Sequence, residues 1–182
     1  SAVILDKDSR VTGVRVHWIF DEFYTLFTLE VIDPDRDGTA EPDLVRQLAK
    51  ENLKNLAAYS YFTFIEVDGQ QPDYGPIVEY DSYLEGDNLI MEFVVPLVEP
   101  VDPREKDFSY AVYDPTYYIE IFHVEGFTLS TEGQLPAGCR LELEEPNPNP
   151  ETVAFAASLD QTESGGDGLG ALFAERVHLR CR

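Results

Sequence analysis

Three aspartates at alternate positions, followed by a glycine, are the residues of this sequence best suited to a chemical task. Asp33, Asp35, Asp37 and Gly38 form a D-x-D-x-D-G loop. Calcium takes about six to eight oxygen ligands at about 2.3–2.6 Å, and alternate carboxylates on a tightly wound loop converge on one point. Glycine after the third aspartate permits the sharp turn of such a loop. The spacing therefore predicts a site for a hard divalent cation, with Ca²⁺ as the first candidate.

The residues after the glycine supply the remaining candidate ligands. With Asp33 as the first position of the loop, Thr39 would offer its backbone carbonyl, and Glu41 would coordinate directly or through water. An EF-hand ends its loop with a bidentate glutamate, where this chain has Leu44, and the nearest acid is Asp43, one residue earlier. The alternative is an acidic connection whose carboxylates favour the positive N-terminus of a helix and remain solvated.

The loop is expected to join a strand to a helix. The run 24–32 reads Tyr-Thr-Leu-Phe-Thr-Leu-Glu-Val-Ile, and its aromatic and β-branched residues favour a strand. After the loop, apolar residues recur at helical spacing and predict an amphipathic helix over 42–59, with Pro42 in its first turn. This is the one long helix that the sequence predicts, and its apolar stripe must cover a sheet face.

Short strand-like segments, separated by turns, occupy most of the remaining sequence. The runs 152–159 and 169–175 favour short helices instead. The expected strands are 2–5, 11–20, 62–67, 77–84, 89–97, 108–113, 117–124, 127–130, 139–143 and 176–181. The sequence therefore predicts an α+β fold that is mainly β, with antiparallel sheets in a sandwich-like arrangement, one long helix on a sheet face and two short helices.

The two cysteines lie at the edges of strand-like runs. A disulfide between Cys139 and Cys181 would tie the C-terminal strand to the sheet and would imply an oxidising compartment. The alternative is two unpaired thiols in a cytosolic protein. A length of 182 residues predicts a single domain over 1–182, in which 147–182 is either an integral part or an appendage tied back by this bond.

The charge and composition restrict the classes of partner. The chain has 13 basic and 35 acidic residues, a formal net charge of −22. Such a chain repels phosphates and anionic lipid and attracts cations, so nucleic acid is not an expected partner. Apolar residues make up 43% of the sequence, which excludes global disorder. No apolar run reaches the roughly 18–20 residues of a membrane helix, so the chain is not expected to span a membrane.

Other chemical motifs are missing from the sequence. The three histidines, His17, His123 and His178, have no spacing typical of a zinc or nickel site, so they give no support for Zn²⁺ or Ni²⁺. Without a nucleophile elbow, a P-loop or a dinucleotide fingerprint, we expect the protein not to be an enzyme. The turn 113–118, Tyr-Asp-Pro-Thr-Tyr-Tyr, could line a pocket, but we expect it to serve cross-strand aromatic packing.

Several runs, taken together, resemble one protein family over essentially the whole chain. These runs are 18–24, 51–56, 112–118, 136–139 and 169–174. They resemble domain of unknown function 1007, a bacterial family regarded as the periplasmic component of an uncharacterised ABC-type transport system. Members are exported, and many are encoded near nickel, cobalt or zinc transporters. The resemblance implies a periplasmic accessory in divalent-metal handling.

The sequence departs from this family at its start. Members usually carry a His-Pro-His run just upstream of the first strand, whereas residues 1–5 read Ser-Ala-Val-Ile-Leu. The acidic loop matches the aspartate-rich segment of the family, with Leu44 in place of the usual acidic residue.

Three functional hypotheses follow. The first is a non-enzymatic, periplasmic or secreted accessory protein of a divalent-cation transport system, with structural Ca²⁺ in the acidic loop and a membrane transporter component as its partner. For this hypothesis we expect a mature chain whose signal peptide has been removed. The second is a metal-free interaction or scaffold domain with a solvated acidic surface. The third, an enzyme that uses carboxylates, has no motif to support it. The sequence leaves the oligomeric state open.

Overall fold

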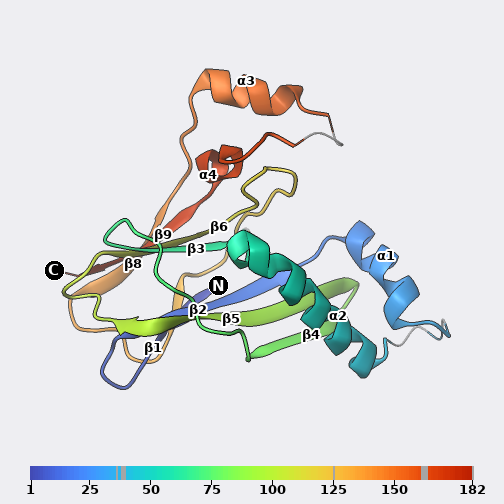
Figure 1. The fold of residues 1–182 in the computed structure, drawn as a ribbon, viewed down its shortest axis with the longest axis horizontal. Helices are drawn as coiled ribbons and strands as arrows, with labels where there is room; N and C mark the ends of the chain where they lie inside the picture. Colours follow the sequence, from blue (N-terminus) through green and yellow to red (C-terminus); the bar gives the residue numbers. More distant parts are fainter. Residues whose placement is uncertain (36, 38–39, 125, 161–163, 182) are drawn as a thin grey trace.

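Two β-sheets and four α-helices make up the fold, which a computed structural model describes for residues 1–35, 37, 40–124, 126–160 and 164–181 (Figure 1). The elements in chain order are β1 (Ala2–Leu5), β2 (Val11–Ile19), α1 (Glu22–Ile32), α2 (Pro42–Leu56), the 3₁₀ segment η1 (Ala57–Phe62), β3 (Thr63–Val67), β4 (Tyr80–Glu85), β5 (Asn88–Val101), β6 (Phe108–Val112), β7 (Ser130–Glu132), β8 (Cys139–Glu144), α3 (Pro150–Ser158), α4 (Leu169–Phe173) and β9 (Arg176–Cys181). This is the mainly β α+β fold that the sequence predicts.

The two sheets share one hydrophobic core. The first sheet has the strand order β4-β5-β2-β1-β7 and the second the order β3-β6-β9-β8, with antiparallel pairing except between β1 and β7. In β2, which confirms the strand expected over 11–20, Val14 and Val16 are buried while Arg15 is half-buried. Side chains of both sheets, such as Phe93 and Ile65, belong to the same buried cluster, so the sheets pack face to face.

Helix α2 crosses the five-stranded sheet and begins at Pro42, as predicted (Figure 1). Its buried residues Val45, Ala49 and Leu53 recur every fourth position and form the stripe that packs inward. The helix ends at Leu56, earlier than expected, and a 3₁₀ segment follows. Among the described residues, no helix is long and apolar enough to cross a membrane.

The strand predicted over 24–32 is wrong, because this run forms helix α1. Asp21 caps the helix: its carboxylate accepts a hydrogen bond from the Tyr24 N–H at 2.8 Å. The buried positions, Thr25, Thr28 and Ile32, follow helical spacing. Large apolar side chains occupy the outward face instead: Phe23, Leu26, Phe27 and Val31, with Phe23 86% exposed. The aromatic and β-branched residues resembled a strand because the helix presents most of its apolar residues to solvent.

The strand predicted over 117–124 is also wrong, because a buried carboxylate holds this segment as a loop. Asp114, 5% exposed, accepts hydrogen bonds from the backbone N–H groups of Thr116, Tyr118 and Ile119 at 2.9–3.1 Å. Backbone donors that point at one side chain are not available to a neighbouring strand. The loop that follows β6 is therefore tightly bound to its own first turn.

Three further strands differ clearly in extent from the prediction. The strand expected over 89–97 runs from Asn88 to Val101. The strand expected over 77–84 begins only at Tyr80, and the one expected over 127–130 is Ser130–Glu132. The latter pairs in parallel with β1, so the N-terminal strand lies between two neighbours. The expected strands 2–5, 139–143 and 176–181 are present with the same starting residues.

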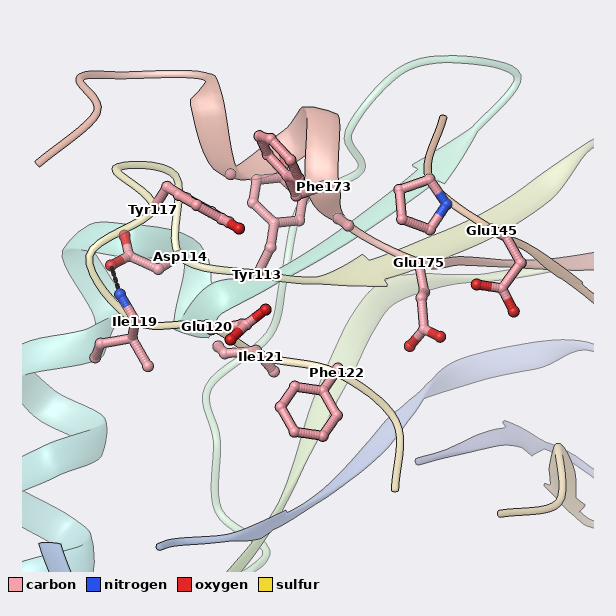
Figure 2. Close-up of a pocket in the computed structure, with 13 residues that line it drawn as sticks. Tyr113, Asp114, Tyr117, Ile119, Glu120, Ile121, Phe122, Glu145, Phe173 and Glu175 are labelled. Atoms are coloured by element: carbon pink, nitrogen blue, oxygen red, sulfur yellow. Dashed lines mark hydrogen bonds between the residues drawn. The ribbon is translucent and has the colours of Figure 1, made fainter. Parts of the chain in front are cut away.

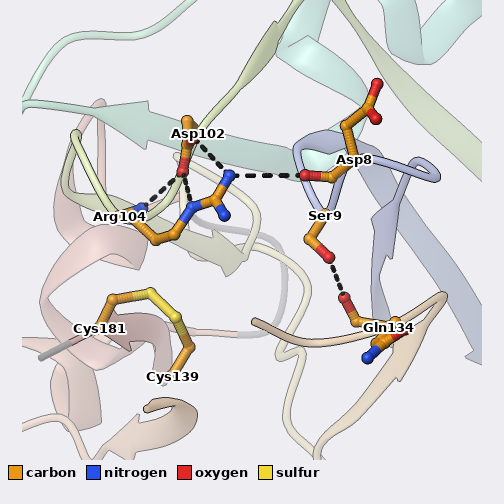
Figure 3. The surroundings of a disulfide bond; sticks show 7 residues. All are labelled: Asp8, Ser9, Asp102, Arg104, Gln134, Cys139 and Cys181. Carbon is orange, nitrogen blue, oxygen red and sulfur yellow. Dashed lines mark hydrogen bonds and ion pairs between the residues drawn. A yellow bond between two sulfur atoms is a disulfide. The ribbon is translucent and has the colours of Figure 1, made fainter. Parts of the chain in front are cut away.

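Cys139 and Cys181 form a disulfide, as the sequence suggested (Figure 3). The two residues are opposite each other in the antiparallel register of β8 and β9. Because β9 lies between β6 and β8, the bond joins two neighbouring strands of the second sheet. The final strand of the described chain is thereby integrated into the sandwich.

Tyr110 in β6 is buried among apolar side chains, and its hydroxyl lies 2.8 Å from the Ser1 Oγ. Burial raises the pKa of Tyr110 to about 12, and the hydrogen bond to Ser1 opposes this effect. An unperturbed tyrosine titrates near pH 10, so between about pH 10 and 12 the unfolded chain has lost a proton that the folded chain retains. Stability must therefore fall as the pH rises through this window.

We expect this fall to be smaller in a Tyr110→Phe variant, which has no phenol at this position to ionise in the unfolded state. Urea unfolding at about pH 9 and about pH 11 should show the native chain losing about 1 kcal/mol more than the variant, given about 1.4 kcal/mol per unit of pKa difference. Below about pH 9 the difference between the two proteins should be independent of pH. Parallel losses across the alkaline window would contradict the assignment.

Candidate functional site

The acidic loop connects α1 to α2, and backbone hydrogen bonds close its two ends. The Asp33 N–H donates to the Leu29 carbonyl at 2.9 Å and ends α1, while the Glu41 N–H donates to the Ile32 carbonyl at 2.8 Å. Ile32, together with Val45 of α2, belongs to a second buried cluster beneath the loop. The loop therefore leaves and re-enters the fold at nearly the same point.

The carboxylates of Asp33, Asp35 and Asp37 converge. One oxygen of each lies within 4.8 Å of the others, and Asp33 is only 8% exposed. The Asp37 N–H donates to the Asp33 Oδ1 at 3.1 Å, so the loop turns back on its first ligand candidate. Carboxylates gathered this closely form a concentrated negative charge that attracts a cation. Three hard oxygen donors around one point fit Ca²⁺.

The other sequence-predicted ligands are not part of this group. Thr39 lies outside the described residues. Asp43 is exposed in the first turn of α2, where the helix dipole favours a negative charge. The Oε2 of Glu41 is buried and has no hydrogen-bond partner in the described part of the chain. A buried carboxylate oxygen normally has a hydrogen-bond donor, a water or an ion beside it. Glu41 is therefore the candidate for a further ligand beside the three aspartates.

Each histidine contacts a glutamate instead of another histidine. The pairs are His17 Nδ1 with Glu92 Oε1 at 2.6 Å, His123 Nδ1 with Glu175 Oε2 at 2.7 Å, and His178 Nε2 with Glu144 Oε2 at 2.6 Å. Within the described ranges, the loop aspartates are the one group of three or more His, Cys, Asp or Glu side chains whose ligand atoms converge in this way.

A second feature, which the sequence analysis did not predict, is a hollow of about 240 Å³ between the loop after β6 and helix α4 (Figure 2). Tyr113 and Tyr117 of the predicted aromatic turn line it. Tyr113 also stacks on Phe64 across the sheet with ring centroids 4.2 Å apart, as expected. Tyr117 stacks on Phe173 of α4 at 4.6 Å. The turn therefore both packs and forms the wall of a pocket, which we call the aromatic hollow.

Backbone contacts fix the two walls of the aromatic hollow against each other. The N–H groups of Gly168 and Gly170 donate to the Pro115 carbonyl at 3.0 and 3.3 Å. A Cβ at Gly170 would overlap the carbonyl oxygen of Asp114, so only glycine allows this approach. Two runs that carry the family resemblance, 112–118 and 169–174, thus meet here, and that resemblance is the sequence feature that could have pointed to the hollow.

The aromatic hollow is electronegative. Glu120, Glu145 and Glu175 line it, and no lysine or arginine is among its lining residues in the described chain. Burial, and then the negative charge of Glu120, raise the pKa of Tyr117. The lining carboxylates would attract a cation and repel an anion.

Comparison with known proteins gives one family and one distant relative. The family described as "Protein of unknown function (DUF1007)" matches residues 1–181. A protein of Haemophilus influenzae, named "Uncharacterized protein", is 25% identical over 178 residues, which cover 96% of this chain and 84% of the relative. No solved structure matches the chain.

Proposed function

The chain belongs to the DUF1007 family of proteins of unknown function, and on this premise we propose that it is a non-enzymatic, extracytoplasmic protein that binds a divalent cation. One observation carries the proposal: the carboxylates of Asp33, Asp35 and Asp37 converge within 4.8 Å. The Oε2 of Glu41, near the end of the same loop, supports it, because this oxygen is buried and has no hydrogen-bond partner among the residues that the structure describes. The protein serves as an accessory of a divalent-cation transport system, with a membrane transporter component as its partner.

Calcium is the cation that best fits this donor set. Carboxylate oxygens on an irregular loop suit the variable coordination of Ca²⁺, whereas Mg²⁺ requires near-octahedral geometry and retains its waters. Zn²⁺ and Ni²⁺ favour histidine or cysteine, and here the histidines pair with glutamates elsewhere. A bound ion would link the end of α1 to the start of α2. Its role is therefore structural: it holds two helices at a fixed angle.

The disulfide between Cys139 and Cys181 supports a place outside the cytosol, because such bonds persist in oxidising compartments. We infer a periplasmic or secreted protein. The net charge of −22 also favours the attraction of cations over contact with anionic lipid.

A metal-free interaction domain is the second candidate function. The outward face of α1 favours it, because Phe23 and Phe27 are 86% and 75% exposed and lie one helical turn apart. For this alternative, the loop carboxylates are stabilised by hydrogen bonds such as that from the Asp37 N–H to Asp33.

Calorimetric titration of chelator-stripped protein with Ca²⁺, Zn²⁺ and Ni²⁺ tests the proposal. We expect one calcium site, and an Asp35→Asn/Asp37→Asn variant should bind Ca²⁺ at least about tenfold more weakly, since calcium affinity follows the number of charged ligands. Both side chains are exposed, so the variant should remain folded. The matched control, Glu99→Gln/Glu151→Gln, removes the same charge from other exposed positions and should leave the affinity unchanged.

The alternative outcomes are distinct. Equal weakening in the loop variant and in the control would mean that calcium responds only to net charge. No heat of binding with any of the three ions would support the metal-free interaction domain. Heat with Zn²⁺ or Ni²⁺ alone, unchanged in the loop variant, would place the functional metal away from the acidic loop.

A further inference from the structure

We propose that the aromatic hollow binds an organic cation, an alkylammonium or guanidinium group with an apolar stem. This inference concerns a different site from the calcium loop and does not depend on it. The ligand is either a free amine or the side chain of a lysine or arginine on another molecule, since both offer the same chemistry.

The size of the hollow suits a small organic molecule. It measures about 240 Å³. A water molecule takes about 30 Å³ of liquid, so the hollow has room for roughly eight groups of that size. A single metal ion would leave most of this volume empty. A short aliphatic chain that ends in an ammonium group would fill it.

The walls provide an apolar stem with a surface to pack on. Tyr117 and Phe173 stack on each other, and this contact holds both rings in place. Figure 2 shows Tyr117 to the left of Phe173 and Tyr113, and Phe122 below them at the lower edge of the hollow. Aromatic faces attract ammonium and guanidinium groups and also pack against methylene groups. A hydrated metal ion would gain little from such a wall.

The carboxylates provide the countercharge. Figure 2 shows Glu120, Glu145 and Glu175 below and to the right of the rings. Glu120 and Glu145 are exposed, and neither forms a salt bridge with a basic side chain of the described chain. Glu175 is held in place by His123, whose backbone N–H and ring nitrogen contact its Oε2 at 2.8 and 2.7 Å.

The spacing of these carboxylates distinguishes an organic cation from a metal ion. Within the described residues, the convergent group is formed by the loop aspartates, and the three glutamates of the hollow do not bring their oxygens so close together. A compact ion needs its ligands within one coordination sphere. A longer cation can instead place its charged end beside one carboxylate and its stem against the rings.

Titration with cadaverine, monitored by amide NMR, tests the proposal. We expect saturable shifts confined to the loop after β6 and to α4, and no binding of the neutral isostere 1,5-pentanediol. A Glu120→Gln/Glu145→Gln variant should bind cadaverine at least about tenfold more weakly, because charge attraction is lost. Phe173→Leu should weaken binding by loss of the aromatic face. Glu99→Gln/Glu151→Gln, with the same net charge change, should bind normally.

A blocked lysine tripeptide and ethylguanidine distinguish the sources of the ligand. Binding of the tripeptide as tight as that of cadaverine would indicate a protein partner, and preference for cadaverine a free amine. The Asp35→Asn/Asp37→Asn variant should bind cadaverine like the native chain, which separates this site from the calcium loop. Equal binding of the diol, equal weakening in the charge control, or no saturation with any of these probes would overturn the proposal.

Discussion

Removal of the disulfide, as a Cys139→Ser/Cys181→Ser variant, is expected to lower the free energy of unfolding by about 3–4 kcal/mol. The two cysteines are 42 residues apart, so the bond closes a long loop and restricts the unfolded chain. It also secures β8, an edge strand, to β9. Urea denaturation of the variant and the native protein, followed by circular dichroism, measures the difference.

The native protein in excess reductant is the control for this prediction. Once reduced, it should match the double variant, and thiol counting under denaturing conditions should find two thiols only after reduction. A loss below about 1 kcal/mol would mean that the reduced, unfolded chain is already restricted by other contacts.

The second large effect is expected from Gly170→Ala, which should lower the free energy of unfolding by about 2–3 kcal/mol. The new methyl group would overlap the carbonyl oxygen of Asp114, and backbone cannot yield as a flexible side chain can. Relief requires α4 to move away from the loop after β6, which separates Phe173 from Tyr117. The variant should therefore lose cadaverine binding as well as stability.

Gly75→Ala is the matched control. A Cβ at Gly75 would lie 3.3 Å from a side-chain carbon of Pro96, a tight contact with a ring rather than with backbone. This variant should change stability by less than about 1 kcal/mol. Equal destabilisation by the two substitutions would show that the contact between α4 and the loop is not special.

The sheets were predictable because their pattern is local. Val14 and Val16 alternate with polar neighbours, and Pro42 is a proline at a helix start. Helix α1 was not predictable from this pattern, since Thr25 and Thr28 face the interior while Phe23 faces solvent. Here the cap at Asp21 and contacts from elsewhere in the chain decide the conformation, and a count of apolar residues gives the wrong result.

The acidic loop and the aromatic hollow also differ in how far the sequence predicts them. The aspartates of the acidic loop lie at alternate positions, so their convergence could be expected from the spacing alone. The aromatic hollow needs Tyr117 and Phe173 from distant parts of the sequence, together with the hydrogen bonds of Asp114 that turn an expected strand into a loop. No periodic pattern in the sequence predicts that these distant segments come into contact.

The outward aromatic face of α1 has a consequence for the colloidal behaviour of the protein. Two copies can bring Phe23 and Phe27 together only by bringing two charges of −22 together as well. At neutral pH and low salt this repulsion opposes self-association. Near the isoelectric point of about 4.2 this charge repulsion is absent, and we expect the protein to self-associate through the exposed rings. The net negative charge thus has a role that is independent of any ligand, since it opposes self-association through the exposed apolar face of α1.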